Sequence, residues 1–285
     1  MLRWASGAPN DIEDRMNHAA WTAGPGGRAS ALRPGVPIPE WSFVTDPAAR
    51  AALAANMAAS RWTERWSGLG AAEDRVRQAI LRGFARSGRA PDAARLAATT
   101  GVDEQAVASI LGALCRRDLV VLDDEDATRV TAAYPFCAWD TGHRVRLGDT
   151  GTTVGSLCAI DALGAGAMLG CDTAVDSSCR NCGTPIRITT RDGGHALHSV
   201  SPTAAVVWAG IRCADGCSAT SGCTVKVFFC SGEHLAAWRG RTDPDGTGFR
   251  LSVEAALQVG KALFVPMLAA GPIGRDDELP RGDAG

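Results

Sequence analysis

Apolar residues recur at helical spacing in the first half of the chain. Residues 71–87 place Val76, Ile80 and Phe84 on one face, which predicts an amphipathic helix. Similar spacing and capping residues predict three more helices: residues 46–60, with Asp46 as N-cap and Pro47 in the first position, residues 91–100, and a segment that begins after Asp103.

A pair of short strands follows these helices. The segment LVVLDDEDATRV (119–130) reads as two strands joined by an acidic turn, so the order is helix, helix, helix, hairpin. That is the order of a winged helix-turn-helix, which binds DNA in some proteins and serves packing or protein contacts in others. The turn 123–126 is wholly acidic and would repel phosphate. We therefore expect no nucleic-acid partner.

The second half of the chain mixes both periodicities and predicts an α+β protein. We expect a helix from Cys158 to about Leu169, strands near 173–176, 185–190, 204–211 and 225–229, and helices over 233–239 and 252–263. The predicted domains are an N-terminal extension with one helix (1–70), a winged-helix-like domain (71–135) and a mixed α/β catalytic domain (136–285).

Composition and the absence of targeting motifs indicate the general class of protein. The 285 residues are 46% hydrophobic and 21% charged with a formal charge of −2, which is typical of a soluble globular protein and not of a general nucleic-acid binder. The chain starts without the apolar core of a signal peptide and lacks an uninterrupted membrane-length apolar run. We expect a cytoplasmic protein whose thiols are reduced. Phosphate-loop, nucleotide-binding, HExxH and nucleophile-elbow motifs are also missing.

Cysteines are concentrated in the second half. Eight of the ten lie between Cys158 and Cys230. Cys158 and Asp161 are three residues apart at a predicted helix start, so both side chains share a face and the helix dipole favours a thiolate. Apolar neighbours would desolvate Asp161 and raise its pKa. Cys223 precedes an alternating strand. Two thiols and a carboxyl suit the capture of a soft metal beside a proton donor, although each alone could be a packed cysteine or a helix cap.

These segments resemble a known family. LCAIDALG (157–164) is similar to the Cys-x-x-Asp segment of organomercurial (alkylmercury) lyases, and CTVKVFFCS (223–231) is similar to their later cysteine-and-strand segment. VDSSCRNCGTPI (175–186) and the upstream AYPF and HRV add to the likeness, which covers about residues 74–238. One departure is Thr224, since the family often has a second cysteine there.

The resemblance implies an enzyme for mercuric resistance that cleaves carbon–mercury bonds and releases a hydrocarbon and Hg(II). It implies that Cys158 captures mercury, that Asp161 takes a proton from Cys223, and that Asp161 returns this proton to the leaving carbon. No cofactor would be required. Low-molecular-weight thiols would remove Hg(II), and a mercuric reductase would be the partner that receives it.

Four further cysteines have metal-ligand spacing. Cys179 and Cys182 form a CxxC pair, and Cys213 and Cys217 form a CxxxC pair. They could bind a structural zinc, relay mercury, or be incidental, with Cys179 in the core. The following residues complete the candidates: Cys171 and Cys230 as further relay thiols, Cys137 and His143 as possible ligands for which a structural role is favoured, and Cys115 as a core residue.

Two other functions fit the same residues. The chain could be a non-enzymatic, thiol-rich metal-binding or metal-sensing protein with the winged-helix module as its output. It could also be a zinc-stabilised interaction domain, which chelation would unfold.

Overall fold

The fold is built around one large antiparallel sheet. The computed structural model describes residues 30–148, 150–212 and 218–268. The strands of the large sheet, in spatial order, are β10 (Ala196–Ser201), β9 (Pro185–Arg191), β8 (Thr173–Ser178), β6 (Arg144–Leu147), β7 (Thr153–Ser156), β5 (Phe136–Cys137), β4 (Val130–Ala133) and β3 (Val120–Leu122). The smaller sheets are β12 (Lys226–Phe229), β11 (Val206–Gly210) and β13 (Gly248–Ser252), and β1 (Ala31–Arg33) with β2 (Val36–Pro37).

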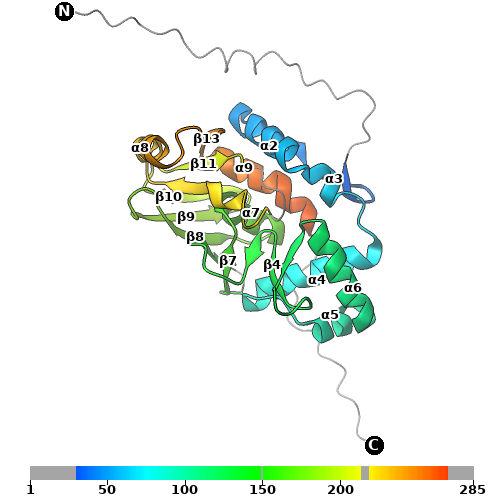
Figure 1. The fold of residues 1–285 in the computed structure, drawn as a ribbon. Coiled ribbons are helices and arrows are strands. Elements are labelled where there is room, and N and C mark those ends of the chain that lie inside the picture. Colours follow the sequence, from blue (N-terminus) through cyan, green and yellow to red (C-terminus); the bar gives the residue numbers. More distant parts are fainter. Residues whose placement is uncertain (1–29, 149, 213–217, 269–285) are drawn as a thin grey trace, which may run out of the picture.

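The α-helices surround these sheets (Figure 1). They are α2 (Pro47–Ser60), α3 (Trp62–Trp66), α4 (Ala71–Ser87), α5 (Ala93–Thr100), α6 (Glu104–Arg116), α7 (Ala159–Leu169), α8 (Gly232–Thr242) and α9 (Val253–Phe264). Short 3-10 turns are η1 (Trp41–Phe43), η2 (Cys223–Val225) and η3 (Val265–Met267). None of the described helices is long and apolar enough to cross a membrane. The predicted caps are present, since Asp46 accepts a hydrogen bond from the Ala49 N–H at 2.9 Å and Asp103 caps α6.

Helices α4, α5 and α6 precede the β3–β4 hairpin in the predicted order. The hairpin does not stand apart, because β4 also pairs with β5 through Ala132 opposite Cys137. It therefore forms one edge of the large sheet. One expectation for α6 is wrong: Cys115 is exposed. The buried stripe of α6 runs through Val107, Leu111 and Leu114, and Cys115 lies beside that stripe in the last turn.

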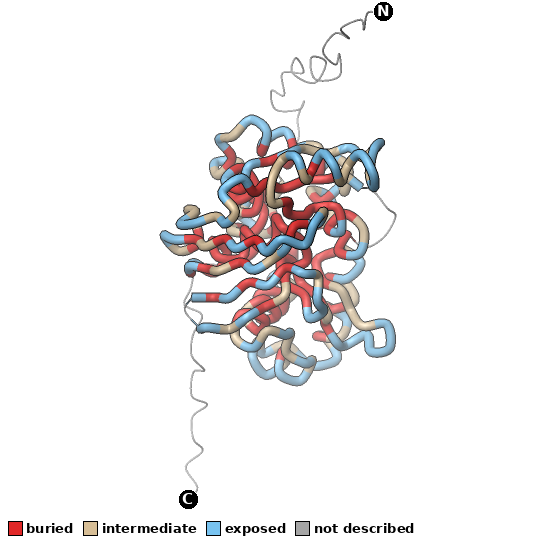
Figure 2. Tube along the Cα trace, turned by 90° about the vertical axis from the view of Figure 1, so that its left-hand side faces the viewer, coloured by how far each residue is buried: buried red, intermediate tan, exposed pale blue. Residues whose placement is uncertain are grey.

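Helices α7 and α9 cross at the centre of the molecule. Every residue of α7 is buried, and Figure 2 shows buried residues gathered in the interior of the molecule. A Cβ at Gly164 would lie 2.5 Å from Phe264 Cδ2 and 2.7 Å from the Gly260 carbonyl oxygen. The two helices approach this closely because glycine occupies both contact positions.

The N-terminal segment packs on α9, which lies near the other end of the described chain (Figure 1). Backbone N–H groups of Thr45 and Asp46 both donate to Gln258 Oε1 at 2.9 Å. The Glu40 N–H donates to the Ala262 carbonyl at 2.9 Å. Besides the one helix predicted before residue 70, the structure contains the short helix α3. This segment lies against the region that carries Cys158.

The predicted strands of the second half correspond to β8, β9, β11 and β12. Strands β5, β6, β10 and β13 were not predicted. The first two are at most four residues long, and β10 is largely unburied. Short or polar strands give a weak alternation signal, because their pairing with neighbours, and not their own hydrophobicity, places them in the sheet.

Candidate active site

Cys158 is the N-cap residue of α7, one position before the first helical turn in which we predicted it. Its backbone is extended, with φ of −156°, and its side chain is buried. Asp161 follows in the first turn and is also buried. Strand β7 lies in the interior of the large sheet and leads directly into this cap, so the sheet and the start of α7 fix both side chains.

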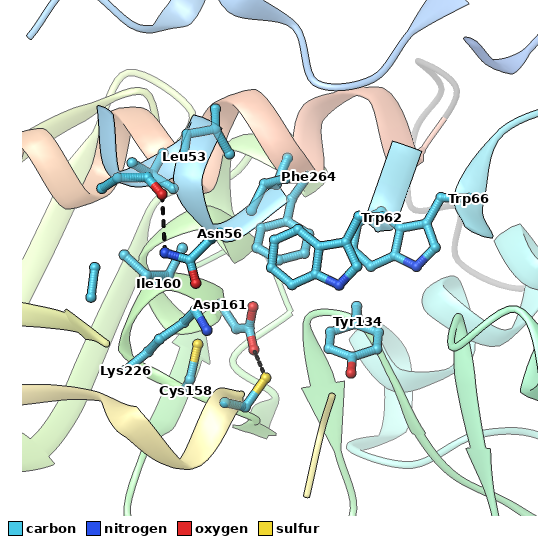
Figure 3. A pocket seen from close by; sticks show the side chains of 15 residues that line it. Leu53, Asn56, Trp62, Trp66, Tyr134, Cys158, Ile160, Asp161, Lys226 and Phe264 are labelled. Carbon is cyan, nitrogen blue, oxygen red and sulfur yellow. Dashed lines mark hydrogen bonds between the residues drawn. The ribbon is translucent and has the colours of Figure 1, made fainter. Parts of the chain in front are cut away.

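Cys223 joins these two residues from a distant part of the chain. It lies in η2, immediately before β12, and its Sγ is 3.7 Å from Oδ2 of Asp161 (Figure 3). The two sulfurs and a carboxyl oxygen all lie within 4.8 Å of one another. We call Cys158, Asp161 and Cys223 the Cys158 cluster. The structure thus brings together the three residues that the sequence analysis singled out.

The pKa values of the three side chains in the Cys158 cluster are shifted in different directions. Burial alone would raise the pKa of Cys158, but the Cys223 thiol, the Lys226 charge and hydrogen bonds from Asp161 lower this pKa to about 7. Burial and the neighbouring Cys158 raise the pKa of Asp161 well above its usual range, as its apolar neighbours predicted. The hydrogen bond to Cys158, together with burial, raises the pKa of Cys223. The cluster therefore combines a thiol that ionises more readily than usual with a carboxyl group that holds its proton more tightly than usual.

Lys226 is a buried cation that the sequence analysis missed. Its side chain is 6% exposed, and its Nζ donates to the Gly222 carbonyl at 2.8 Å. It lowers the pKa of Cys158 and opposes the rise in the pKa of Asp161. The signal in the sequence was a lysine inside the apolar run TVKVFF. Strand alternation places Val225 and Val227 inward and Lys226 outward, but in the structure all four residues of β12 are buried.

An aromatic pocket opens onto the Cys158 cluster. Its solvent-accessible volume is about 20 Å³, and Cys158, Asp161 and Cys223 all line it. The other lining residues come mainly from α2, α3, α7 and α9 and include Leu53, Asn56, Trp62, Trp66, Tyr134, Ile160 and Phe264 (Figure 3). The Trp62 and Trp66 rings stack with centroids 5.1 Å apart. Sequence analysis did not assign these residues, because the pocket depends on long-range packing of the N-terminal segment.

Asp118 positions the segment that leads to Cys223. Its carboxylate accepts hydrogen bonds from the Ser218 backbone N–H at 3.1 Å and from Arg65 Nη1 at 3.1 Å. Ser218 in turn accepts the Cys223 backbone N–H at 2.9 Å through its carbonyl. One buried carboxylate therefore links α3 to the turn that carries the second thiol.

The other predicted ligands are distributed in three ways. Cys179 and Cys182 form a second group with Cys230 and His234. The sequence analysis had not considered His234. Cys213 and Cys217 lie outside the described residues. Cys171 is buried and belongs to neither group.

Cys137 and His143 are both buried and serve the packing of the sheet. The Cys137 thiol donates to the Trp139 carbonyl at 3.4 Å, and burial raises its pKa to about 12. His143 Nδ1 lies 2.9 Å from Ser177 Oγ, and burial lowers its pKa to about 4. Neither residue belongs to a group of potential metal ligands within the described chain.

Comparisons with known proteins agree with this geometry. Residues 136–265 match the family model described as alkylmercury lyase, a range that includes the whole Cys158 cluster. The mercury-bound form of MerB2 is a similar solved structure, with a TM-score of 0.61 and 23% sequence identity, over 78% of this chain and 100% of that chain. No curated protein matches the chain significantly.

The matched region, which covers somewhat less than half of the chain, identifies a domain of the alkylmercury lyase type. The overall fold is similar to that of mercury-bound MerB2.

Proposed function

We propose that the protein cleaves carbon–mercury bonds by protonolysis, giving a hydrocarbon and Hg(II). The observation that carries this proposal is the placement of two thiols and one carboxyl group within 4.8 Å of one another. Thiolates bind a soft metal well, and a protonated acid beside them can supply the proton that the leaving carbon needs.

Cys158 performs the first step. Its pKa of about 7 leaves a large fraction of this thiol as the thiolate at neutral pH. This thiolate attacks R–Hg–X, where X is a thiolate or another anion; the Cys158–mercury bond forms and the Hg–X bond breaks. Burial and the Cys158 charge raise the pKa of Asp161, and mercury neutralises that charge. Asp161 consequently releases its proton, and X leaves as HX.

Cys223 supplies the second thiolate. The Asp161 carboxylate takes the Cys223 proton across the 3.7 Å contact, and Cys223 then binds mercury. Donation from two sulfurs weakens the Hg–C bond, and Asp161 returns the proton to carbon. The hydrocarbon leaves, Hg(II) stays bound to Cys158 and Cys223, and Asp161 is left as a carboxylate.

External thiols complete the cycle without a resident cofactor. Two low-molecular-weight thiols take up Hg(II) as a dithiolate, and their two protons restore the Cys223 thiol and the Asp161 acid. This exchange returns the cluster to its starting charge. In a cytoplasmic detoxification system, a mercuric reductase would then receive the Hg(II).

The aromatic pocket would hold the organic group. Trp62 and Phe264 line it together with Cys158. A buried apolar wall excludes water from the developing carbanion and favours apolar substituents on mercury.

The test is headspace detection of methane or benzene from methylmercury or phenylmercury, with purified protein and excess thiol. We expect hydrocarbon from the wild type and from Cys115→Ser, whose thiol is exposed on α6, and none from Cys158→Ser. Tight mercury binding without hydrocarbon release from the wild type would refute the proposed chemistry.

A further inference from the structure

A second group of metal ligands lies at the far end of β12 from Cys223. It comprises Cys179, Cys182, Cys230 and His234, which we call the Cys182 cluster; its four ligand atoms all lie within 4.8 Å of one another. Cys182 Sγ is 3.8 Å from Cys230 Sγ, and Cys179 Sγ is 3.7 Å from His234 Nδ1. His234 Nδ1 also lies 3.1 Å from Cys182 Sγ and 3.0 Å from Cys230 Sγ.

Two local backbone structures present these ligands. Cys179 and Cys182 flank a tight turn between β8 and β9, in which the Gly183 N–H donates to the Cys179 carbonyl at 2.9 Å. Gly183 closes the turn with φ of +74°, a backbone conformation that glycine adopts readily. Cys230 ends β12, and His234 lies one turn into α8, three residues after its N-cap Ser231.

We propose that the Cys182 cluster binds one structural Zn²⁺ ion through three thiolates and one imidazole. Tetrahedral zinc with Zn–S bonds of about 2.3 Å requires sulfur–sulfur separations near 3.8 Å, with shorter separations to nitrogen. The Cys182–Cys230 distance has that value, and His234 Nδ1 lies closer than this to the sulfurs of Cys182 and Cys230. The CxxC pair and the CxxxH pair (Cys230 and His234) also have zinc-ligand spacing.

The position of the cluster favours a structural ion over a mercury relay. Strand β12 separates Cys223 from Cys230, and its four residues span about 13 Å at roughly 3.3 Å per residue. Mercury could not pass between these two thiols by direct exchange. A disulfide would use two of the three thiols and leave His234 without a role, whereas one tetrahedral ion uses all four ligands.

The ion would cross-link the large sheet to the three-stranded sheet that contains β12. Cys179 and Cys182 belong to the β8–β9 turn, whereas Cys230 and His234 belong to the junction of β12 and α8. In the protein alone, one backbone hydrogen bond from the Arg180 N–H to the Phe228 carbonyl, at 3.0 Å, already joins these parts. Because β12 carries Lys226 at its other end, this cross-link also supports the Cys158 cluster.

The experiment is metal analysis of the full chain, purified from cells grown without mercury and dialysed against zinc-free buffer. We expect about one zinc per chain in the wild type, in Cys158→Ser and in Cys115→Ser, and a loss of most zinc in Cys182→Ser and Cys230→Ser. X-ray absorption at the zinc edge should give three sulfur ligands and one nitrogen ligand.

A second measurement tests the site without altering its ligands, in case the cysteine variants do not fold. Zinc is removed from the Cys158→Ser protein with a chelator under reducing conditions, and Co²⁺ is added; tetrahedral thiolate coordination gives a sulfur-to-cobalt charge-transfer band and intense visible d–d bands. These bands should disappear on addition of one equivalent of Zn²⁺. A wild-type protein that holds no zinc even after reconstitution, or that takes up only Hg(II), would overturn the proposal. Equal zinc loss from Cys115→Ser and Cys182→Ser would do the same.

Discussion

The Cys223 thiol lies 3.7 Å from the Asp161 carboxyl group, although 62 residues separate them in the sequence. Helix α7 supplies the acid and the turn before β12 supplies the thiol. A proton can therefore move between the two side chains within one buried site, without passing through solvent. The first prediction tests this relationship.

Replacing Asp161 by Asn should stop turnover while mercury binding persists. Both mercury-binding thiols remain, but the amide cannot accept the Cys223 proton or protonate carbon, so hydrocarbon release should fall by about 10²–10⁴-fold. Headspace analysis and Hg(II) titration would measure the two properties. Asp176→Asn is the control, because that carboxylate is exposed and pairs with Arg187 on the surface. Near-normal turnover of Asp161→Asn would rule out this role.

Replacing Lys226 by Met should make the Cys158 thiol less acidic. Cys158 reacts with alkylating agents as the thiolate, so its alkylation rate in the wild type should rise with pH and reach half its maximum near pH 7, the pKa of this thiol. Lys226 lowers that pKa, and without this cation the midpoint should move to higher pH. Mass spectrometry of the peptide that contains Cys158 gives the rate at each pH.

Lys261→Met is the matched control for the Lys226 variant. Lys261 is partly exposed, and its Nζ donates to the His195 carbonyl at 3.0 Å, outside the aromatic pocket. The midpoint for Cys158 should stay where it is in the wild type. An unchanged midpoint in both variants would show that Lys226 does not influence Cys158.

Replacing Trp62 by Ala should discriminate between organic groups. Trp62 forms a wall of the aromatic pocket, and loss of such an apolar contact costs about 1.5–3 kcal/mol, or roughly tenfold to a hundredfold. We expect kcat/KM to fall by that factor for phenylmercury and by less for methylmercury. Trp41→Ala provides a control outside the pocket. Equal losses for both substrates would indicate a general structural effect.

Replacing Gly164 by Ala should destabilise the fold. The new methyl group would meet Phe264 and the Gly260 backbone at 2.5–2.8 Å, and overpacking of this kind costs about 1–3 kcal/mol. Urea unfolding would measure the change in free energy. Gly240→Ala is the opposite case: no atom lies within 4 Å of its added Cβ, in helix α8, so we expect a gain of about 0.5–1 kcal/mol. Equal stability of the two variants would contradict the close α7–α9 packing.

The residues of the Cys158 cluster were predictable because each belongs to a short local pattern. Cys158 and Asp161 share a helix start, and Cys223 precedes a strand with a characteristic sequence. The raised pKa of Asp161 also followed from its apolar neighbours. The burial of Lys226 did not follow, because strand alternation alone assigns it to an outer face, whereas packing on both sides of β12 buries it.

Long-range contacts account for the rest. The sequence analysis grouped Cys182 with Cys213 and Cys217 because of their spacing, whereas folding places it beside Cys230 and His234, about fifty residues further along the chain. The N-terminal helices became walls of the pocket for the same reason. Spacing predicts neighbours within one element, but the approach of separate elements depends on how the sheets and helices pack.

The contacts between the N-terminal segment and α9 also bear on how the protein is made. Gln258 accepts hydrogen bonds from the start of α2 although it lies 212 residues further along the chain, and Phe264 lines the pocket together with Trp62. A chain still on the ribosome, with α9 inside the exit tunnel, already carries its reactive cysteines but has neither the partner of α2 nor the finished pocket. The thiols would thus be synthesised before the structure that shelters them, and a cell exposed to mercury would have its most vulnerable copies of this enzyme among those not yet completed.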